Sequence, residues 1–107
     1  MFLIRRKCLT TRDNMWKVAS LLKQICSLYE EQGRGEAIIY VSGFGTPADD
    51  YSVSAEWTQE TINSSAFENV PDKIRNKLSA ELQSYIHSYK IEFHEIVTEE
   101  KLSQRGL

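Results

Sequence analysis

The chain has 107 residues, a formal net charge of −2 and a hydrophobic content of 41%. This length suits one domain with one core, and the charge argues against a nucleic-acid surface, which needs Lys and Arg in excess. No apolar run approaches the roughly 20 residues that span a bilayer, so we expect a cytoplasmic protein that does not bind membranes. Because Cys8 and Cys26 have no CxxC spacing, we expect two buried reduced thiols and neither a metal nor another cofactor.

The first half of the chain predicts a strand followed by a long helix. Residues 2–9 carry apolar side chains on both sides, which is typical of a strand with neighbours on each edge. One side holds Phe2, Ile4 and Cys8, and the other holds Leu3, Arg5, Lys7 and Leu9. Over residues 13–32 the apolar residues recur every three or four positions, as on one face of a helix. Gly33 and Gly35 are the stop signals.

A β-hairpin follows the predicted helix. Residues 36–42 are β-branched and aromatic, residues 51–58 alternate strictly between apolar and polar, and the glycines, proline and aspartates of 43–50 supply the turn. The alternation puts Tyr51, Val53, Ala55 and Trp57 on one face and Ser52, Ser54, Glu56 and Thr58 on the other. The apolar face therefore needs cover from another part of the chain.

The second half predicts a loop, a helix and a last strand. Residues 61–70 indicate a loop with one helical turn, and Pro71 suits the first position of a second helix, which ends near residue 87. His87 would then cap the helix, where a cation suits the negative end of its dipole. A strand follows and ends near Val97, with Tyr89, Ile91 and Phe93 alternating with Lys90, Glu92 and His94. Residues 98–107 form a polar tail that frays or lies over a neighbouring surface.

The order strand, helix, strand, strand, helix, strand predicts an α+β domain over residues 1–97, of the ferredoxin-like βαββαβ type. Right-handed crossovers place both helices on one face of a four-stranded antiparallel sheet. The other face has no cover within the chain and mixes apolar and charged residues. Such a face usually marks an interface, so we expect a homodimer formed through the open sheet face.

Polar residues on the predicted open face form the candidate catalytic set. Glu56 lies on the third strand, Glu92 and His94 lie on the fourth, and Arg5 or Lys7 of the first strand joins them. Enclosure in a dimer would shift their pKa values, as in sites that transfer protons, with His94 and Glu56 as the catalytic residues. The alternative is an ion-pair network that sets the register of the dimer without catalysis.

Five aromatic residues predict either a ligand pocket between the helices and the sheet or ordinary core packing. They are Trp16, Tyr29, Tyr40, Trp57 and Tyr85. We select Trp16, Tyr40 and Trp57 as ligand-binding candidates, together with Arg5 and Glu92.

The chain resembles the dimeric α+β barrel superfamily of ferredoxin-like folds, which holds NIPSNAP-like and antibiotic-biosynthesis-monooxygenase-like domains. The resemblance covers residues 1–97 through the order and length of the elements, and locally through Gly43-Phe-Gly-Thr46 leading into Ser54-Ala-Glu-Trp57. It implies a barrel formed by two facing sheets, with pockets inside it or between sheet and helices.

Two activities of the superfamily bear on this chain. Haem-degrading relatives carry an Asn on the first strand, a Trp on the third and a His on the second helix. Trp57 matches the Trp, residues 2–9 contain no Asn, and His87 falls at the end of the predicted helix. Other relatives oxidise aromatic polyketides without a cofactor.

The sequence thus predicts a homodimeric ferredoxin-like domain that binds a small apolar or aromatic molecule. A cofactor-independent enzyme resembling a monooxygenase or isomerase is one alternative. A structural or regulatory dimerisation module without catalysis is the other. Because one fold hosts many functions, the sequence leaves all three open.

Overall fold

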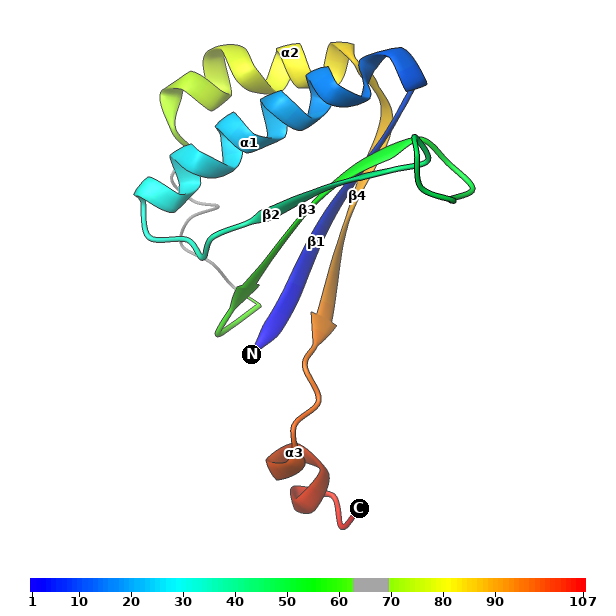
Figure 1. The fold of residues 1–107 in the computed structure, drawn as a ribbon. Coiled ribbons are helices and arrows are strands. Elements are labelled where there is room, and N and C mark those ends of the chain that lie inside the picture. The colour runs from blue at the N-terminus through cyan, green and yellow to red at the C-terminus, as the bar shows by residue number, and fades with distance from the viewer. Residues whose placement is uncertain (63–69) are drawn as a thin grey trace.

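A computed structural model describes residues 1–62 and 70–107 of the chain. Its centre is a four-stranded antiparallel sheet in the order β2-β3-β1-β4 (Figure 1). The strands are β1 (Phe2–Thr10), β2 (Ile38–Ser42), β3 (Ser52–Gln59) and β4 (Ile86–Glu95). The predicted ferredoxin-like βαββαβ arrangement is confirmed, and β1 lies inside the sheet between β3 and β4, which explains its apolar residues on both sides.

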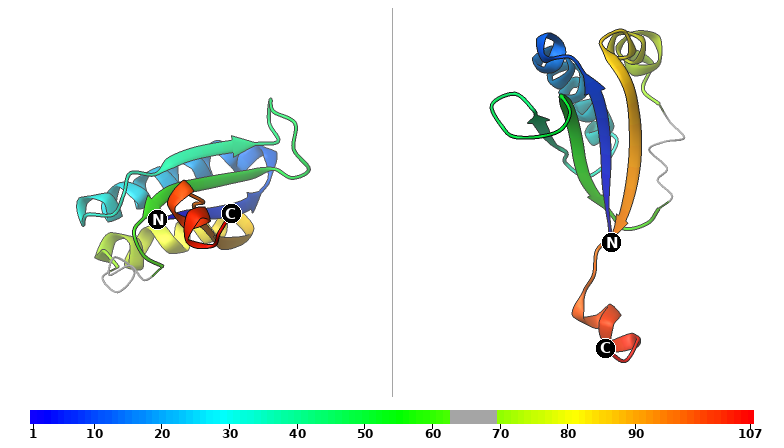
Figure 2. Two further views of the ribbon diagram at one scale, coloured as in Figure 1. Left: turned by 90° about the horizontal axis from the view of Figure 1, so that it is seen from below. Right: turned by 90° about the vertical axis from the view of Figure 1, so that its right-hand side faces the viewer.

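Two main helical segments cover one face of the sheet (Figures 1 and 2). A short 3₁₀ turn, η1 (Arg12–Asn14), leads into α1 (Met15–Glu31). The second segment occupies residues 72–84 and contains a π-helical stretch, η3 (Ile74–Leu78), followed by α2 (Ser79–Ser84). A third helix, α3 (Glu99–Gln104), lies beyond the end of β4.

The core fills the space between this covered face and the helices. The helical stripe predicted for the first helix points inward through Met15, Val18, Leu21, Leu22, Ile25 and Cys26. These residues meet Ile4 and Cys8 of β1, Val53, Ala55 and Trp57 of β3, and Ile74, Leu78 and Leu82 of the second segment. Both cysteines are buried and free, as predicted. The alternation of β3 therefore sets which side chains enter the core.

The second helix ends earlier than its sequence predicts, and His87 does not cap it. The helix ends at Ser84, and the Thr10 hydroxyl donates a hydrogen bond to the carbonyl of Tyr85. Because Thr10 of β1 pairs with Ile86, the strand β4 begins at Ile86 and includes His87. Pairing with a central strand outweighs the local helical preference of these residues.

The tail also differs from its prediction, because it contains the helix α3. The loop predicted for 61–70 lies almost wholly outside the described residues, since the structure describes neither its helical turn nor any other part of 63–69. No helix in the described part of the chain is long and apolar enough to cross a membrane.

Candidate functional site

The candidate site lies on the open face, which is the face of the sheet turned away from α1 and α2. Antiparallel register aligns its side chains in rows that run across the four strands. One row is Ile38, Glu56, Arg5 and Glu92, and the next is Tyr40, Ser54, Lys7 and Lys90. Successive rows lie two residues apart along each strand, about 7 Å, so the two rows form one continuous polar surface.

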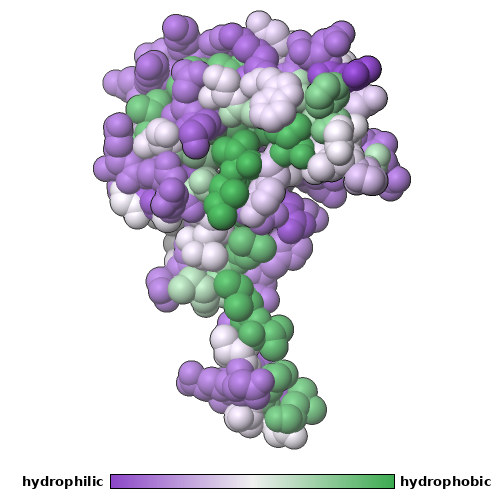
Figure 3. All heavy atoms as spheres, viewed as in Figure 1, coloured by the Kyte–Doolittle hydropathy of each residue, from purple (hydrophilic) through white to green (hydrophobic). Residues whose placement is uncertain are grey.

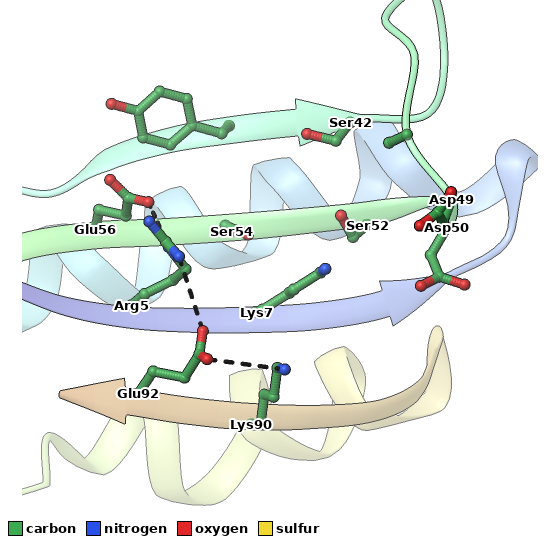
Figure 4. Close-up of a pocket in the computed structure, with 12 residues that line it drawn as sticks. Arg5, Lys7, Ser42, Asp49, Asp50, Ser52, Ser54, Glu56, Lys90 and Glu92 are labelled. Atoms are coloured by element: carbon green, nitrogen blue, oxygen red, sulfur yellow. Dashed lines mark hydrogen bonds and ion pairs between the residues drawn. The ribbon is translucent and has the colours of Figure 1, made fainter. Parts of the chain in front are cut away.

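Arg5 is the centre of the first row, with a carboxylate on each neighbouring strand (Figure 4). Its Nε donates a hydrogen bond to Glu56 Oε1 at 2.6 Å, and its Nη1 lies 3.9 Å from Glu92 Oε1. The Nζ atom of Lys90 lies 3.8 Å from Glu92 Oε2. Four charges thus form a chain of alternating sign across β3, β1 and β4.

This pairing fixes the charge of Arg5. The hydrogen bond that Arg5 donates to Glu56 raises the pKa of the Arg5 guanidinium, with further attraction from the charges of Glu56 and Glu92. Arg5 is therefore a fixed cation at physiological pH. Glu56 Oε1 is already engaged by the Arg5 guanidinium, so this carboxylate holds Arg5 in place on the sheet.

The second row places two cations side by side. Lys7 of β1 is the direct partner of Lys90 on β4, and like charges in directly opposite positions repel. Lys90 leans toward Glu92, whereas Lys7 has no ion pair among the residues that the structure describes. In Figure 4 the ammonium group of Lys7 extends over the sheet toward Ser52, at the start of β3. In the described part of the chain Lys7 is therefore the cation of this row without an ion pair, and the carboxylates of Asp49 and Asp50 lie on the side to which it points.

A hollow of about 550 Å³ lies over both rows. Its floor is formed by side chains of all four strands, and Ala48, Asp49 and Asp50 of the β2–β3 loop form a wall at one end (Figure 4). Ser52 of the floor is only 3% exposed. The hollow has room for a small molecule and a mainly polar lining.

The structure brings together four of the seven sequence candidates. Arg5, Tyr40, Glu56 and Glu92 line the hollow. His94 is on the same face but one row further along, opposite Leu3, and does not line it.

Both tryptophans lie elsewhere. Trp57 is on the covered face and 4% exposed, with its Nε1 donating to Gln59 Oε1 at 3.0 Å and the Arg34 guanidinium 4.0 Å from the centre of its ring. Trp16 is 66% exposed on the outer side of α1. The five aromatic residues therefore do not share one pocket, since Tyr40 points to the open face and Trp16 to the outside of the domain.

Sequence reasoning missed several residues that line the hollow. Lys90, Ser42, Ser52 and Ser54 could have been placed on the open face from alternation alone, but nothing in the sequence indicated that Lys90 would lie opposite Lys7. Asp49 and Asp50 read as turn residues, and only the path of the loop brings them to the hollow. Across the described residues, no group of three or more His, Cys, Asp or Glu side chains is arranged to hold a metal ion.

Comparisons with family models and with curated protein sequences find no match to this chain. Solved structures do match. A protein from Agrobacterium tumefaciens superposes with a TM-score of 0.71 at 9% identity, covering 92% of this chain and 96% of that one. An antibiotic biosynthesis monooxygenase gives a TM-score of 0.65 at 9% identity, covering 92% of this chain and 100% of the other.

A dimeric ferredoxin-like protein from an uncultured marine organism gives a TM-score of 0.59 at 14% identity, covering 92% of this chain and 89% of that one. Together these matches show that the chain shares the ferredoxin-like fold of these structures, as the order of its elements predicts. Identities this low show the fold alone, and one fold hosts many functions.

Proposed function

We propose that this chain is a homodimeric α+β barrel domain that binds a small molecule bearing an anionic group in the hollow on its open face. The dimer is supported by large apolar side chains on that face, because Ile38 is 60% exposed and Tyr40 is 44% exposed beside the charged rows. An uncovered face that mixes apolar residues with an ordered charge network is typical of an interface. One solved structure with this fold is described as dimeric.

The observation that indicates a negatively charged ligand is the pair formed by Lys7 and Lys90 at the floor of the hollow. The two residues are directly paired in the sheet and both line the hollow, so a carboxylate or phosphate bound there can pair with the ammonium group of Lys7, which has no ion pair in the described part of the chain. The Ser54 hydroxyl is in the same row and can donate a further hydrogen bond. The ring of Tyr40 offers an apolar contact at the edge, which suits an aromatic or partly apolar ligand.

The enzyme alternative finds less support in the geometry. Its basis is the fold shared with a protein described as an antibiotic biosynthesis monooxygenase, and its residues would be Glu56 and His94. Glu56 is held by Arg5, and His94 lies outside the lining of the hollow. Neither is positioned to remove a proton from a molecule bound between the two lysines, so binding is the better-supported function.

Light scattering on a size-exclusion column tests the dimer. We expect a particle of twice the 12.4 kDa chain mass. A monomer would overturn the barrel and leave the open face as an exposed surface.

Thermal shift measurements with salicylate, an aromatic carboxylate, test the ligand class, with benzyl alcohol as the neutral comparison. We expect salicylate to raise the Tm of the wild type by several degrees and benzyl alcohol to leave it unchanged. Lys7→Met should abolish the shift. Lys73→Met, which removes an exposed lysine of the second helical segment, should retain it. A dimer whose Tm responds to neither compound would instead support the structural or regulatory module.

A further inference from the structure

The hollow on the open face is lined mainly by charged and hydroxyl-bearing side chains. Hydrophobic residues on the surface run through the body of the domain and on along α3 in Figure 3. Among the residues that line the hollow, by contrast, only Tyr40 and Ala48 are apolar. Ion pairs and hydrogen bonds therefore decide which small molecules bind in the hollow.

The end of the hollow next to the β2–β3 loop holds charges of both signs. Lys7 and Lys90 lie on its floor, and Asp49 and Asp50 belong to the wall that the loop forms. In Figure 4 the side chain of Lys7 extends toward this end. A ligand bound here meets carboxylates as well as ammonium groups.

The two aspartates have no partner within the chain. Both are exposed, and neither side chain has an ion pair or a hydrogen bond among the residues that the structure describes. Lys7 likewise has no ion pair there. A ligand with one charged group of each sign can therefore pair with Lys7 and with the aspartates, and no ion pair of the protein has to break.

Ser52 is a further polar group without a partner at the same end of the hollow. It follows Asp50 by two residues and pairs with Leu9, one row along from Lys7. The residue is only 3% exposed, and its hydroxyl makes no hydrogen bond within the described part of the chain. Because a hydroxyl that is removed from water without a partner is unfavourable, a ligand that bonds to Ser52 restores the missing interaction.

A second, smaller hollow adjoins the same charged groups. It has a volume of about 180 Å³ and is lined by Lys7, Leu9, Asp50, Ser88, Tyr89 and Lys90. Lys7, Asp50 and Lys90 line both hollows, so charges of both signs lie where the two hollows meet. The anionic and the cationic group of one ligand must therefore be close to each other.

We propose that the ligand of the hollow is an α-amino acid, which carries a protonated amine beside its carboxylate. This inference rests on the proposed function and names the class of its ligand. The carboxylate of the amino acid pairs with Lys7 and accepts a hydrogen bond from the Ser52 hydroxyl. Its ammonium group pairs with Asp49 and Asp50. An apolar side chain of the amino acid enters the smaller hollow, against Leu9.

Isothermal titration of the full chain with two matched compounds tests the proposal. L-phenylalanine and 3-phenylpropionate share a carbon skeleton and a carboxylate, and only L-phenylalanine has the amine. The aspartates attract the ammonium group and repel a plain carboxylate. We expect the Kd of L-phenylalanine to be about tenfold lower than that of 3-phenylpropionate.

Removal of the loop carboxylates should affect the two compounds in opposite directions. The double variant Asp49→Asn with Asp50→Asn removes both charges from an exposed loop, and Asp72→Asn removes an exposed carboxylate of the second helical segment as the control. We expect the double variant to raise the Kd of L-phenylalanine about tenfold and to lower the Kd of 3-phenylpropionate. Asp72→Asn should change neither. A general effect on folding would move both values in the same direction.

The outcomes separate this inference from the proposed function on which it rests. If salicylate raises the Tm through Lys7 while L-phenylalanine binds no more tightly than 3-phenylpropionate, the hollow takes a plain anion and the amino acid is overturned. Parallel changes of the two Kd values in the double variant would also overturn it. If none of the three compounds binds, the anion-binding function fails together with this inference.

Discussion

Lys7 of β1 lies directly opposite Lys90 of β4, and only one of these two ammonium groups has a carboxylate partner. Replacing Lys7 by Glu turns the repulsion into an attraction, so we expect Lys7→Glu to raise the free energy of unfolding by about 0.5 kcal/mol. Urea denaturation measures this change, and Lys73→Glu is the control at an exposed site. The same Lys7→Glu variant should lose its response to salicylate. If Lys7→Glu lowers the free energy of unfolding instead, the ammonium groups of Lys7 and Lys90 do not repel each other appreciably in the wild type.

The hydrogen bond of 2.6 Å between Arg5 and Glu56 predicts a measurable coupling between these side chains. Because both are partly exposed, we expect a coupling free energy of about 0.5 to 1 kcal/mol in a double-mutant cycle of Arg5→Met and Glu56→Gln. The coupling should fall when salt is added to a monomeric sample and persist in a dimer that shields the pair. A coupling near zero would mean that the two groups act independently.

The ion pair between Glu95 at the end of β4 and Lys101 of α3 predicts a dependence of stability on pH. The hydrogen bond and the charge of Lys101 lower the pKa of the Glu95 carboxyl. A lowered folded-state pKa adds stability above the unfolded value, about 4.3, and this contribution is lost as the pH falls through the folded value.

NMR titration of the Glu95 side chain checks this dependence. The midpoint should lie below the ordinary Glu range in the wild type and return toward it in Lys101→Met. Equal midpoints in the two proteins would contradict the contact.

The two thiols should differ in reactivity. Cys8 is fully buried, and burial raises the pKa of its thiol, so little thiolate forms at pH 8. Cys26 is 4% exposed and lies in the lining of a surface hollow beside α1. We expect iodoacetamide to label Cys26 slowly and Cys8 hardly at all in the native protein, and both in urea. Peptide mapping by mass spectrometry measures the two rates, and faster labelling of Cys8 would show that its strand opens first.

The sequence predicted the fold because its local periods were consistent. The alternation of residues 51–58 placed Val53, Ala55 and Trp57 in the core, and the spacing of apolar residues in 13–32 placed the buried stripe of α1. Failures came where tertiary contacts outweighed local signals. His87 joined β4 because β1 offers a pairing partner up to Thr10. The helix of the tail is a different case, because local signals form it: the Thr98 side chain caps its start and Gly106 follows its end.

The alternation of side chains along each strand was enough to place Arg5, Glu56 and Glu92 on the open face, since side chains two residues apart in a strand share a face. The register of the strands is different, because it depends on how two strands that are far apart in the sequence align with each other in the sheet. Only the tertiary structure set Arg5 between two carboxylates and Lys7 against Lys90. Likewise only the path of the β2–β3 loop brought Asp49 and Asp50 to the hollow, and only the direction of β4 placed α3 away from the core.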